Sequence, residues 1–323
     1  MKNFLFSLLL LSFALSCTRP NTLSQEASAT NRLQDGERLI TLNGIKHWVK
    51  VKGSQHQTTP IVLVHGGPGG NHYVFERTAG PELEKFATVI YYEQRGSGRS
   101  QAPSNPEDYA LPTLISDLRA LQDSLGTPKI TLLGYSFGAE LSLRYAIAHP
   151  DKVEKLILSS PAELSPANML VQIQGFYSIG DAPLRSGIEK VLKDTTSLTQ
   201  KYNRVWGLAN VATVDKFLFV DAAKAQFNRQ LWQESKLTNT GLMAKVYLQN
   251  NKADLLELAK NHPTPTLLIS GLHDKNGGLH TALGLKQILP NSQHKLYEQS
   301  AHFPDIEEPN RYAQDVKAFV QAK

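Results

Sequence analysis

Residues 129–148 read KITLLGYSFGAELSLRYAIA, an apolar strand-like run that passes directly into a helical pattern. At the junction lies GYSFG (134–138), a Gly-x-Ser-x-Gly motif. On a turn from a strand to a helix, this motif forms a nucleophile elbow. The serine there has strained backbone geometry, and the two glycines prevent a clash in the tight turn. Ser136 is therefore the candidate nucleophile.

Apolar strand-like runs recur on both sides of this motif. The run Ile61–Val64 is apolar throughout, which is typical of a strand buried on both faces of a parallel sheet. The other runs are Leu39–Leu42, His47–Val51, Thr88–Tyr92, Ile130–Leu133, Leu156–Leu158, Thr266–Ile269 and His294–Tyr297. Helical patterns between most of them are Leu111–Leu125, Phe137–Ala148, Leu279–Leu289 and Pro309–Val320. This alternation predicts a doubly wound, mostly parallel α/β sheet led by an antiparallel hairpin at Asn43-Gly44.

One long interval breaks the alternation. Between Ser160 and Pro263 there is no convincing strand, but there are amphipathic helical patterns such as Leu184–Leu192 and Leu242–Leu258. This composition predicts a helical cap at 163–262, inserted into a sheet domain formed by 38–162 and 263–323.

A glycine-rich loop follows the strand that ends at Val64. It reads HGGPGG (65–70). Acyl transfer needs two backbone N–H donors for the developing oxyanion, and one of them comes from the residue after the nucleophile, here Phe137. The second donor comes from the loop after this earlier strand, where glycines let the backbone approach the substrate. His65 itself is interpreted as a loop-stabilising residue rather than a catalyst.

A base and its orienting acid are expected after the nucleophile in the order Ser, acid, His. Asp274 follows one strand-like run and His302 follows the next, so both are placed at the sheet edge where Ser136 emerges. Two alternatives exist: Glu163 as the acid, and His273 beside Asp274.

Together these motifs resemble the prolyl aminopeptidase (proline iminopeptidase) branch of the α/β-hydrolase superfamily. The resemblance rests on HGGPGG, YYEQRGSGRS (91–100), GYSFG, Asp274 and His302, and it extends from about Arg38 to Lys323. It implies the α/β-hydrolase fold, with a mostly parallel eight-stranded sheet, helices on both faces and an inserted helical cap.

The resemblance also implies roles for individual residues. Ser136 would be the nucleophile, His302 the general base and Asp274 its orienter, with an oxyanion hole from the backbone N–H groups of Gly67 and Phe137. Arg95 and Ser100 would brace the loop beneath that hole, whereas Arg99 is interpreted as a solvated loop charge. No metal or organic cofactor is implied, because HExxH is absent and the histidines are scattered.

The chain departs from the family's pattern at two places. Glu93 stands where the family usually has Asp. Family aminopeptidases hold the substrate's α-ammonium with cap glutamates; Glu234 aligns with the first, but Tyr247 stands where the second is expected. The predicted activity is release of N-terminal residues, proline above all, from short peptides. The alternative is a carboxylester or lactone hydrolase with the same triad, because fold and triad alone do not determine the substrate.

The N-terminus predicts export. Residues 4–15 carry no charge, and Cys17, the single cysteine, follows a small residue just beyond this apolar core. This pattern resembles a bacterial lipoprotein signal, with residues 1–16 removed, Cys17 acylated and 17–37 as a tether on the cell envelope. A soluble secreted or periplasmic protein is the alternative.

The net charge is +5, without a run of five basic residues. We therefore expect a small peptide or ester as partner, no nucleic acid, and membrane contact only through the lipid.

Overall fold

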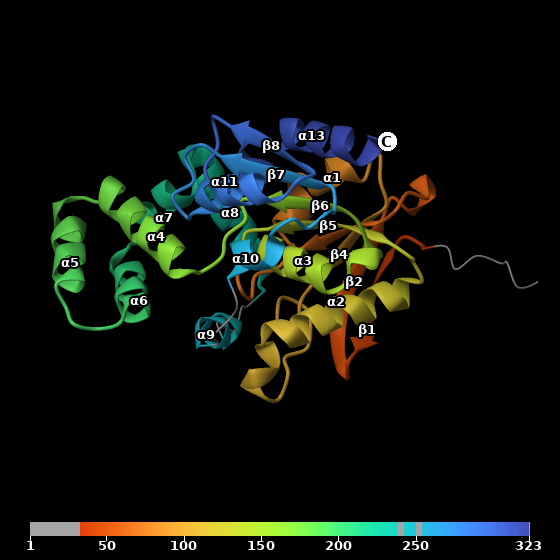
Figure 1. Cartoon of the computed structure of the whole chain (residues 1–323), viewed down its shortest axis with the longest axis horizontal. Helices are drawn as coiled ribbons and strands as arrows, with labels where there is room; N and C mark the ends of the chain where they lie inside the picture. Colours follow the sequence, from red (N-terminus) through yellow and green to blue (C-terminus); the bar gives the residue numbers. More distant parts are fainter. Residues whose placement is uncertain (1–32, 238–241, 250–253, 323) are drawn as a thin grey trace, which may run out of the picture. The chain divides into compact units, whose positions relative to one another are not determined.

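A sheet of eight strands forms the centre of the fold. The computed structural model describes residues 33–237, 242–249 and 254–322 (Figure 1). The strand order is β1-β2-β4-β3-β5-β6-β7-β8; β1, β2 and β4 pair antiparallel, and β3 to β8 are parallel. The strands are β1 (Gly36–Leu42), β2 (Ile45–Lys52), β3 (Ile61–Val64), β4 (Val89–Tyr92), β5 (Ile130–Tyr135), β6 (Val153–Ser159), β7 (Thr266–Gly271) and β8 (Ser292–Tyr297). The predicted mostly parallel eight-stranded sheet is confirmed.

Helices cover both faces of this sheet, and Figure 1 places α13 and α2 on opposite sides of it. Because side chains alternate along a strand, neighbouring residues of β3 enter different cores. Val62 packs in the cluster that contains Leu118 of α2, and Leu63 packs in the cluster that contains Val316 of α13. The helices around the sheet are α1 (Gly80–Leu83), α2 (Leu111–Leu125), α3 (Phe137–Ala148), α11 (Gly278–Ile288), α12 (Pro304–Glu307) and α13 (Pro309–Gln321). Short 3₁₀ turns are η1 (Ser54–His56), η2 (Phe75–Arg77), η3 (Pro106–Tyr109) and η4 (Pro150–Lys152).

A group of helices is inserted between β6 and β7, and the described residues of this interval contain no strand. Part of it has its own apolar cluster, in which the rings of Phe176 and Phe217 stack with centroids 4.0 Å apart. Four of these helices, α4 to α7, lie at the left in Figure 1. The inserted helices are α4 (Pro166–Ile179), α5 (Ala182–Leu192), α6 (Leu198–Leu208), α7 (Val211–Leu218), α8 (Ala222–Ser235), α9 (Leu242–Gln249) and α10 (Leu255–Ala259). We call this insertion the cap.

The sequence predicted a helical pattern over Leu242–Leu258, but this segment does not form one helix. The structure has α9 up to Gln249 and a separate α10 that begins after Asp254. The Asp254 carboxylate accepts hydrogen bonds from the first turn of α10, at 2.8 Å from the Leu256 nitrogen. Aspartate is a strong N-cap residue, so Asp254 starts a new helix within the apolar pattern. The spacing of the apolar residues alone did not reveal this start.

The predicted tether to residue 37 is too long at its end. Strand β1 begins at Gly36, which pairs with Val51 of β2, and the Asp35 carboxylate accepts a hydrogen bond from the Ser54 nitrogen at 2.9 Å. Leu33 packs against the core. Because this segment is polar, the sequence did not predict its backbone pairing with β2. The predicted signal peptide and Cys17 lie outside the described residues.

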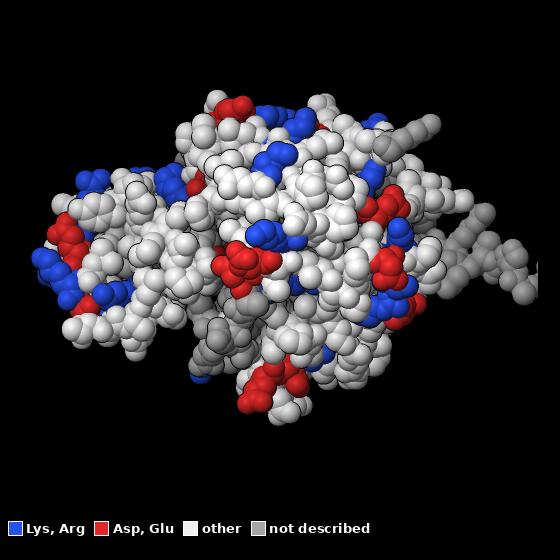
Figure 2. All heavy atoms as spheres, viewed as in Figure 1, with Lys and Arg blue, Asp and Glu red and all other residues white. Residues whose placement is uncertain are grey.

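Positive and negative side chains are interspersed on the face of the molecule shown in Figure 2. In the part of the chain that the structure describes, no helix has the length and apolar character needed to cross a bilayer.

Candidate active site

The Gly-x-Ser-x-Gly motif forms a strained turn between β5 and α3. Ser136 has φ 55° and ψ −125°, a backbone conformation that L-residues rarely adopt. A Cβ at Gly134 would overlap the carbonyl oxygen of Gly138, and a Cβ at Gly138 would overlap the carbonyl oxygen of Val64. Both glycines are therefore required by close backbone contacts, as the sequence predicted.

Ser136, His302 and Asp274 come together at the carboxyl ends of three strands. The distance from Ser136 Oγ to His302 Nε2 is 3.0 Å, and that from His302 Nδ1 to Asp274 Oδ2 is 2.9 Å. Since a carboxylate only accepts, this contact favours the ring proton on Nδ1 and leaves Nε2 as the acceptor for the Ser136 hydroxyl. All three residues are buried.

The alternatives for acid and base are placed elsewhere. Glu163 accepts hydrogen bonds from the Leu255 nitrogen at 3.2 Å and from Arg144 at 3.3 Å. His273 is exposed. The carboxylate against the imidazole of His302 is that of Asp274.

His302 has a further neighbour that sequence reasoning missed. The side-chain amide of Asn276 donates from Nδ2 to His302 Nε2 at 3.0 Å. The Asn276 backbone nitrogen also donates to Asp274 Oδ1 at 2.8 Å. The only signal in the sequence was its position two residues after the predicted acid, where Asp-x-Asn favours a turn.

The glycine-rich loop lies against the nucleophile. A Cβ at Gly66 would be 3.0 Å from the Ser136 Cβ, and both Gly67 and Phe137 line the cavity beside Ser136. His65 is fully buried; its Nδ1 lies 2.9 Å from the Gly66 carbonyl, and burial lowers its pKa to about 4. This neutral, buried histidine supports the loop rather than the chemistry, in line with the prediction.

The brace of the glycine-rich loop differs from the predicted one. Arg95 binds Asp117 of α2 at 2.6 and 2.7 Å, and the Ser100 hydroxyl donates to the Glu93 carbonyl at 2.7 Å. These contacts hold the 91–100 segment itself. The contacts to the loop come from Gln94, whose amide donates to the His65 carbonyl at 2.8 Å and whose backbone nitrogen donates to His65 Nε2 at 3.1 Å. Gln94 lies in the YYEQRGSGRS motif directly before Arg95, the residue that the sequence predicted as a brace.

Arg99 is not a solvated loop charge, which corrects the sequence interpretation. Its guanidinium donates to Glu93 at 2.5 and 3.1 Å and to Glu76 at 3.0 Å, and it stacks over the Trp48 ring at 3.2 Å from the centroid. Glu93, where the family usually has Asp, is fully buried and uses its carboxylate for this pair. Buried carboxylates need such partners, so Arg99 is structural.

A cavity of about 330 Å³ opens beside Ser136. Cap and core both contribute to its wall, and among the residues that the structure describes, every side chain that lines it is neutral. Besides Ser136 itself, the polar residues that line it are Gln172, Tyr202, Asn203, Trp206, Tyr247 and Asn276.

Of the two predicted substrate-binding residues, one lines the cavity and the other does not. Tyr247 lines the cavity, and its ring packs edge-on against that of Phe137, with centroids 5.1 Å apart. Glu234 is exposed on α8, where it accepts a hydrogen bond from Gln230 at 2.8 Å, and it is not part of the cavity lining. Its prediction as an ammonium anchor is wrong, because the helical register of α8 turns this side chain to solvent.

Two buried carboxylates lie behind the cavity wall instead. Glu140 of α3 accepts from Arg144 at 2.8 Å and from the hydroxyl of Tyr247, and Arg144 also contacts Glu163. Burial raises the pKa of Glu163 to about 7, and the nearby charge of Glu140 adds to this. Among residues 33–237, 242–249 and 254–322, no group of three or more His, Cys, Asp or Glu side chains could hold a metal ion.

Comparison with known proteins identifies the family to which this fold belongs. Residues 59–309 match the model of the alpha/beta hydrolase fold family. The chain belongs to this family. Two relatives of this hydrolase are proline iminopeptidases. That of Lactiplantibacillus plantarum is 27% identical, covering 88% of this chain and 99% of the relative. That of Clostridium botulinum is 28% identical over 78% of this chain and 86% of the relative.

Solved structures show the same fold. A proline iminopeptidase-related protein from Thermus thermophilus matches with a TM-score of 0.74 and 20% identity, covering 89% of this hydrolase and 98% of that chain. An esterase from Exiguobacterium antarcticum matches with a TM-score of 0.63 and 20% identity, over 90% and 100% of the two chains.

Proposed function

We propose that this protein is a serine hydrolase with Ser136, His302 and Asp274 as its catalytic triad. The observation that carries the proposal is the continuous hydrogen-bonded path from Ser136 Oγ through the imidazole to Asp274, with distances of 3.0 and 2.9 Å. Ser136 attacks the acyl carbon while His302 Nε2 takes its proton, and Asp274 holds the ring in the required tautomer. The protonated Nε2 then gives its proton to the leaving group, and water releases the acyl group by the same steps.

The oxyanion of each tetrahedral intermediate is bound by the backbone N–H groups of Gly67 and Phe137. Their position beside Ser136 in the cavity supports this role. Such a donor contributes about 3–4 kcal/mol to the transition state, because it is already oriented and partly shielded from water.

We propose small peptides with an N-terminal proline or other residue as the first substrate class. Relatives that align with 88% and 78% of this chain and are named proline iminopeptidases support this proposal. The cavity volume of about 330 Å³ suits one or two residues rather than a folded protein.

A carboxylester or lactone is the second substrate class. The observation that favours it is the neutral cavity lining, since a substrate ammonium would find no carboxylate on the wall that the structure describes. Glu140 is already bonded to the Tyr247 hydroxyl and to Arg144, and Glu163 is bonded to the Leu255 nitrogen and to Arg144.

The first test is labelling with a fluorophosphonate, compared between the wild-type enzyme and Ser136→Ala. Labelling of the wild type alone supports a serine hydrolase, and absence of labelling at Ser136 contradicts it. Aminoacyl-naphthylamides assayed beside p-nitrophenyl esters then separate the two substrate classes.

A further inference from the structure

The reacting nitrogen of His302 has two hydrogen-bond donors in this structure. Ser136 Oγ and Asn276 Nδ2 each lie 3.0 Å from Nε2. A neutral imidazole with its proton on Nδ1 has one lone pair on Nε2, so the two donors share it. The catalytic path described above uses only the first of them.

The backbone of Asn276 is held on both sides, but its side chain borders the cavity. The Asn276 nitrogen donates to Asp274 Oδ1 at 2.8 Å, and the Asn276 carbonyl accepts from Gln172 of α4 at 3.3 Å. Gln172 in turn accepts from Tyr202 at 3.0 Å and from the Trp206 indole at 3.1 Å. Rotation about the side-chain bonds of Asn276 would therefore move the amide without moving the catalytic loop.

We propose that Asn276 is a displaceable partner of the catalytic base, which the leaving group of the substrate must replace at His302 Nε2. This inference rests on the proposed serine hydrolase function. To receive its proton, the leaving atom must come within about 3 Å of Nε2. The Asn276 amide is at that distance from Nε2, and Asn276 lines the cavity where the substrate enters.

The contact also opposes proton transfer. While Nε2 is neutral, the amide N–H donates to its lone pair. Once Nε2 takes the Ser136 proton it becomes a donor, so two N–H groups face each other and the contact is lost. Asn276 thus stabilises the resting base, and a substrate whose leaving group displaces the amide removes this restraint. Asn276 is in this sense a specificity residue that acts on leaving groups.

The test compares Asn276→Ala with Asn276→Leu. Alanine removes both the donor and its bulk, whereas leucine removes the donor and keeps a side chain of similar size. The probe is diisopropyl fluorophosphate. Its fluoride leaving group is small enough to leave without displacing the Asn276 amide from His302 Nε2. We expect both variants to be phosphorylated at Ser136 about three to ten times faster than the wild type, because one competing hydrogen bond is removed.

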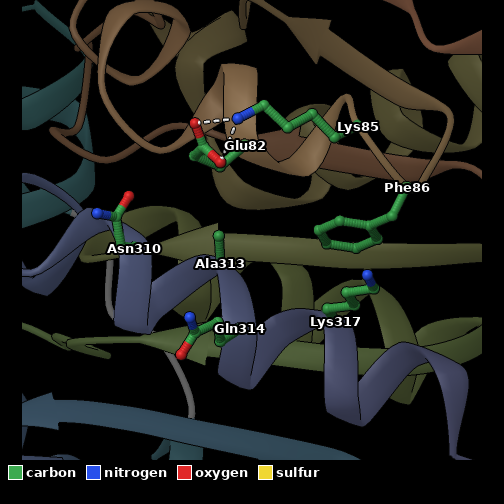
Figure 3. A pocket seen from close by; sticks show the side chains of 7 residues that line it. All are labelled: Glu82, Lys85, Phe86, Asn310, Ala313, Gln314 and Lys317. Carbon is green, nitrogen blue, oxygen red and sulfur yellow. Dashed lines mark hydrogen bonds and ion pairs between the residues drawn. The ribbon is translucent and has the colours of Figure 1, made fainter.

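Two further readouts separate this role from a structural one. With an aryl ester of larger leaving group, Asn276→Ala should retain or exceed wild-type kcat/KM, and Asn276→Leu should lose it. The acidic limb of the inactivation rate against pH should move to higher pH in both variants. Asn310→Ala, an exposed asparagine on α13 (Figure 3), is the matched control and should behave as the wild type. Thermal unfolding checks that each variant is folded.

The outcomes are distinguishable. Wild-type enzyme that is not labelled at Ser136 overturns the proposed function, and this inference with it. Wild-type labelling at Ser136, with folded Asn276 variants that react no faster and keep the same pH profile, overturns the role of Asn276 alone. If only one of the two variants folds, its inactivation rate decides.

Discussion

The hydroxyl of Tyr247 on α9 donates a hydrogen bond to the buried carboxylate of Glu140 on α3. This contact joins the cap to the helix that begins directly after Ser136. The Tyr247 oxygen also accepts from the Leu164 nitrogen at 3.2 Å, so one phenol connects three segments around the cavity. The position of the cavity wall therefore depends on a polar contact between residues that are 107 positions apart in the chain.

Tyr247→Phe should loosen this wall. The variant leaves the Glu140 carboxylate and the Leu164 nitrogen without their phenol partner, which should lower the free energy of unfolding by about 1–3 kcal/mol. We expect KM to rise more than kcat falls, because the phenylalanine ring still packs on Phe137 while the wall is less fixed. Denaturant unfolding and steady-state kinetics measure both effects. Tyr177→Phe, which removes an exposed hydroxyl bonded to Glu189 on the cap surface, is the control and should change neither.

Loss of any triad member should abolish most turnover. Ser136→Ala, His302→Ala and Asp274→Ala should each lower kcat on the order of 10³-fold or more without loss of the fold. Because the three residues act as a unit, the Ser136→Ala/His302→Ala double variant should be barely worse than Ser136→Ala. His273→Ala is the control, since this histidine is exposed beside Asp274. Near-normal turnover in Asp274→Ala together with lost turnover in Glu163→Ala would show that the acid is assigned wrongly.

Asp305 should make the fold less stable at alkaline pH. Burial raises the pKa of this fully buried carboxyl to about 7, against an ordinary value of 3.8. Below the ordinary value, both the folded and the unfolded chain hold the proton. As the pH rises towards 7, the unfolded chain releases it first, so stability present at low pH is progressively lost.

Asp305→Asn cannot ionise and should escape this loss. We expect it to be more stable than the wild type at about pH 8, on the order of 1–3 kcal/mol, with a smaller difference at about pH 4. Thermal unfolding across this pH range measures the effect. Asp123→Asn serves as the control, because Asp123 is an exposed carboxylate paired with Arg119. If the stability of Asp305→Asn and that of the wild type depended on pH in the same way, ionisation of Asp305 would not be the cause of the alkaline loss.

A free-amine preference should decide between the two substrate classes. For an aminopeptidase, acetylation of Pro-naphthylamide should lower kcat/KM by roughly 30- to 1,000-fold, because a charge-assisted contact is lost. A carboxylester or lactone hydrolase should show no such penalty. Glu234→Gln should leave both rates unchanged in either case, because this side chain is exposed on α8 away from the cavity lining. Equal rates on the free and acetylated substrates would exclude the aminopeptidase.

We propose that Cys17 carries the lipid of a cell-envelope lipoprotein. In a bacterial expression host, Cys17→Ser should move the protein from the membrane fraction to the soluble fraction and abolish palmitate incorporation. Cell fractionation and labelled palmitate measure these effects, with Ser16→Ala as a variant that keeps a small residue before the cysteine. Unchanged membrane association of Cys17→Ser would contradict lipidation.

The sequence alone predicted those features that depend on neighbouring residues. The β5–α3 turn follows from GYSFG, because glycines 134 and 138 are the residues that close backbone approach allows. Apolar runs such as Ile61–Val64 predicted the strands, since a strand covered on both faces must be apolar throughout. The order of nucleophile, acid and base then placed Asp274 and His302 at the same sheet edge.

Only the tertiary structure decided which side chains meet across distant segments. Glu234 was expected in the pocket and lies in solvent, because the register of α8 is determined by its packing. Asn276 contacts His302, and Gln94 contacts His65, through loops that come together only when the sheet forms. Their partners are 26 and 29 residues away, and no local pattern encodes such a pairing. Strand and turn formation depend on short-range sterics and burial, whereas the contacts of a side chain depend on where the whole chain places its neighbours.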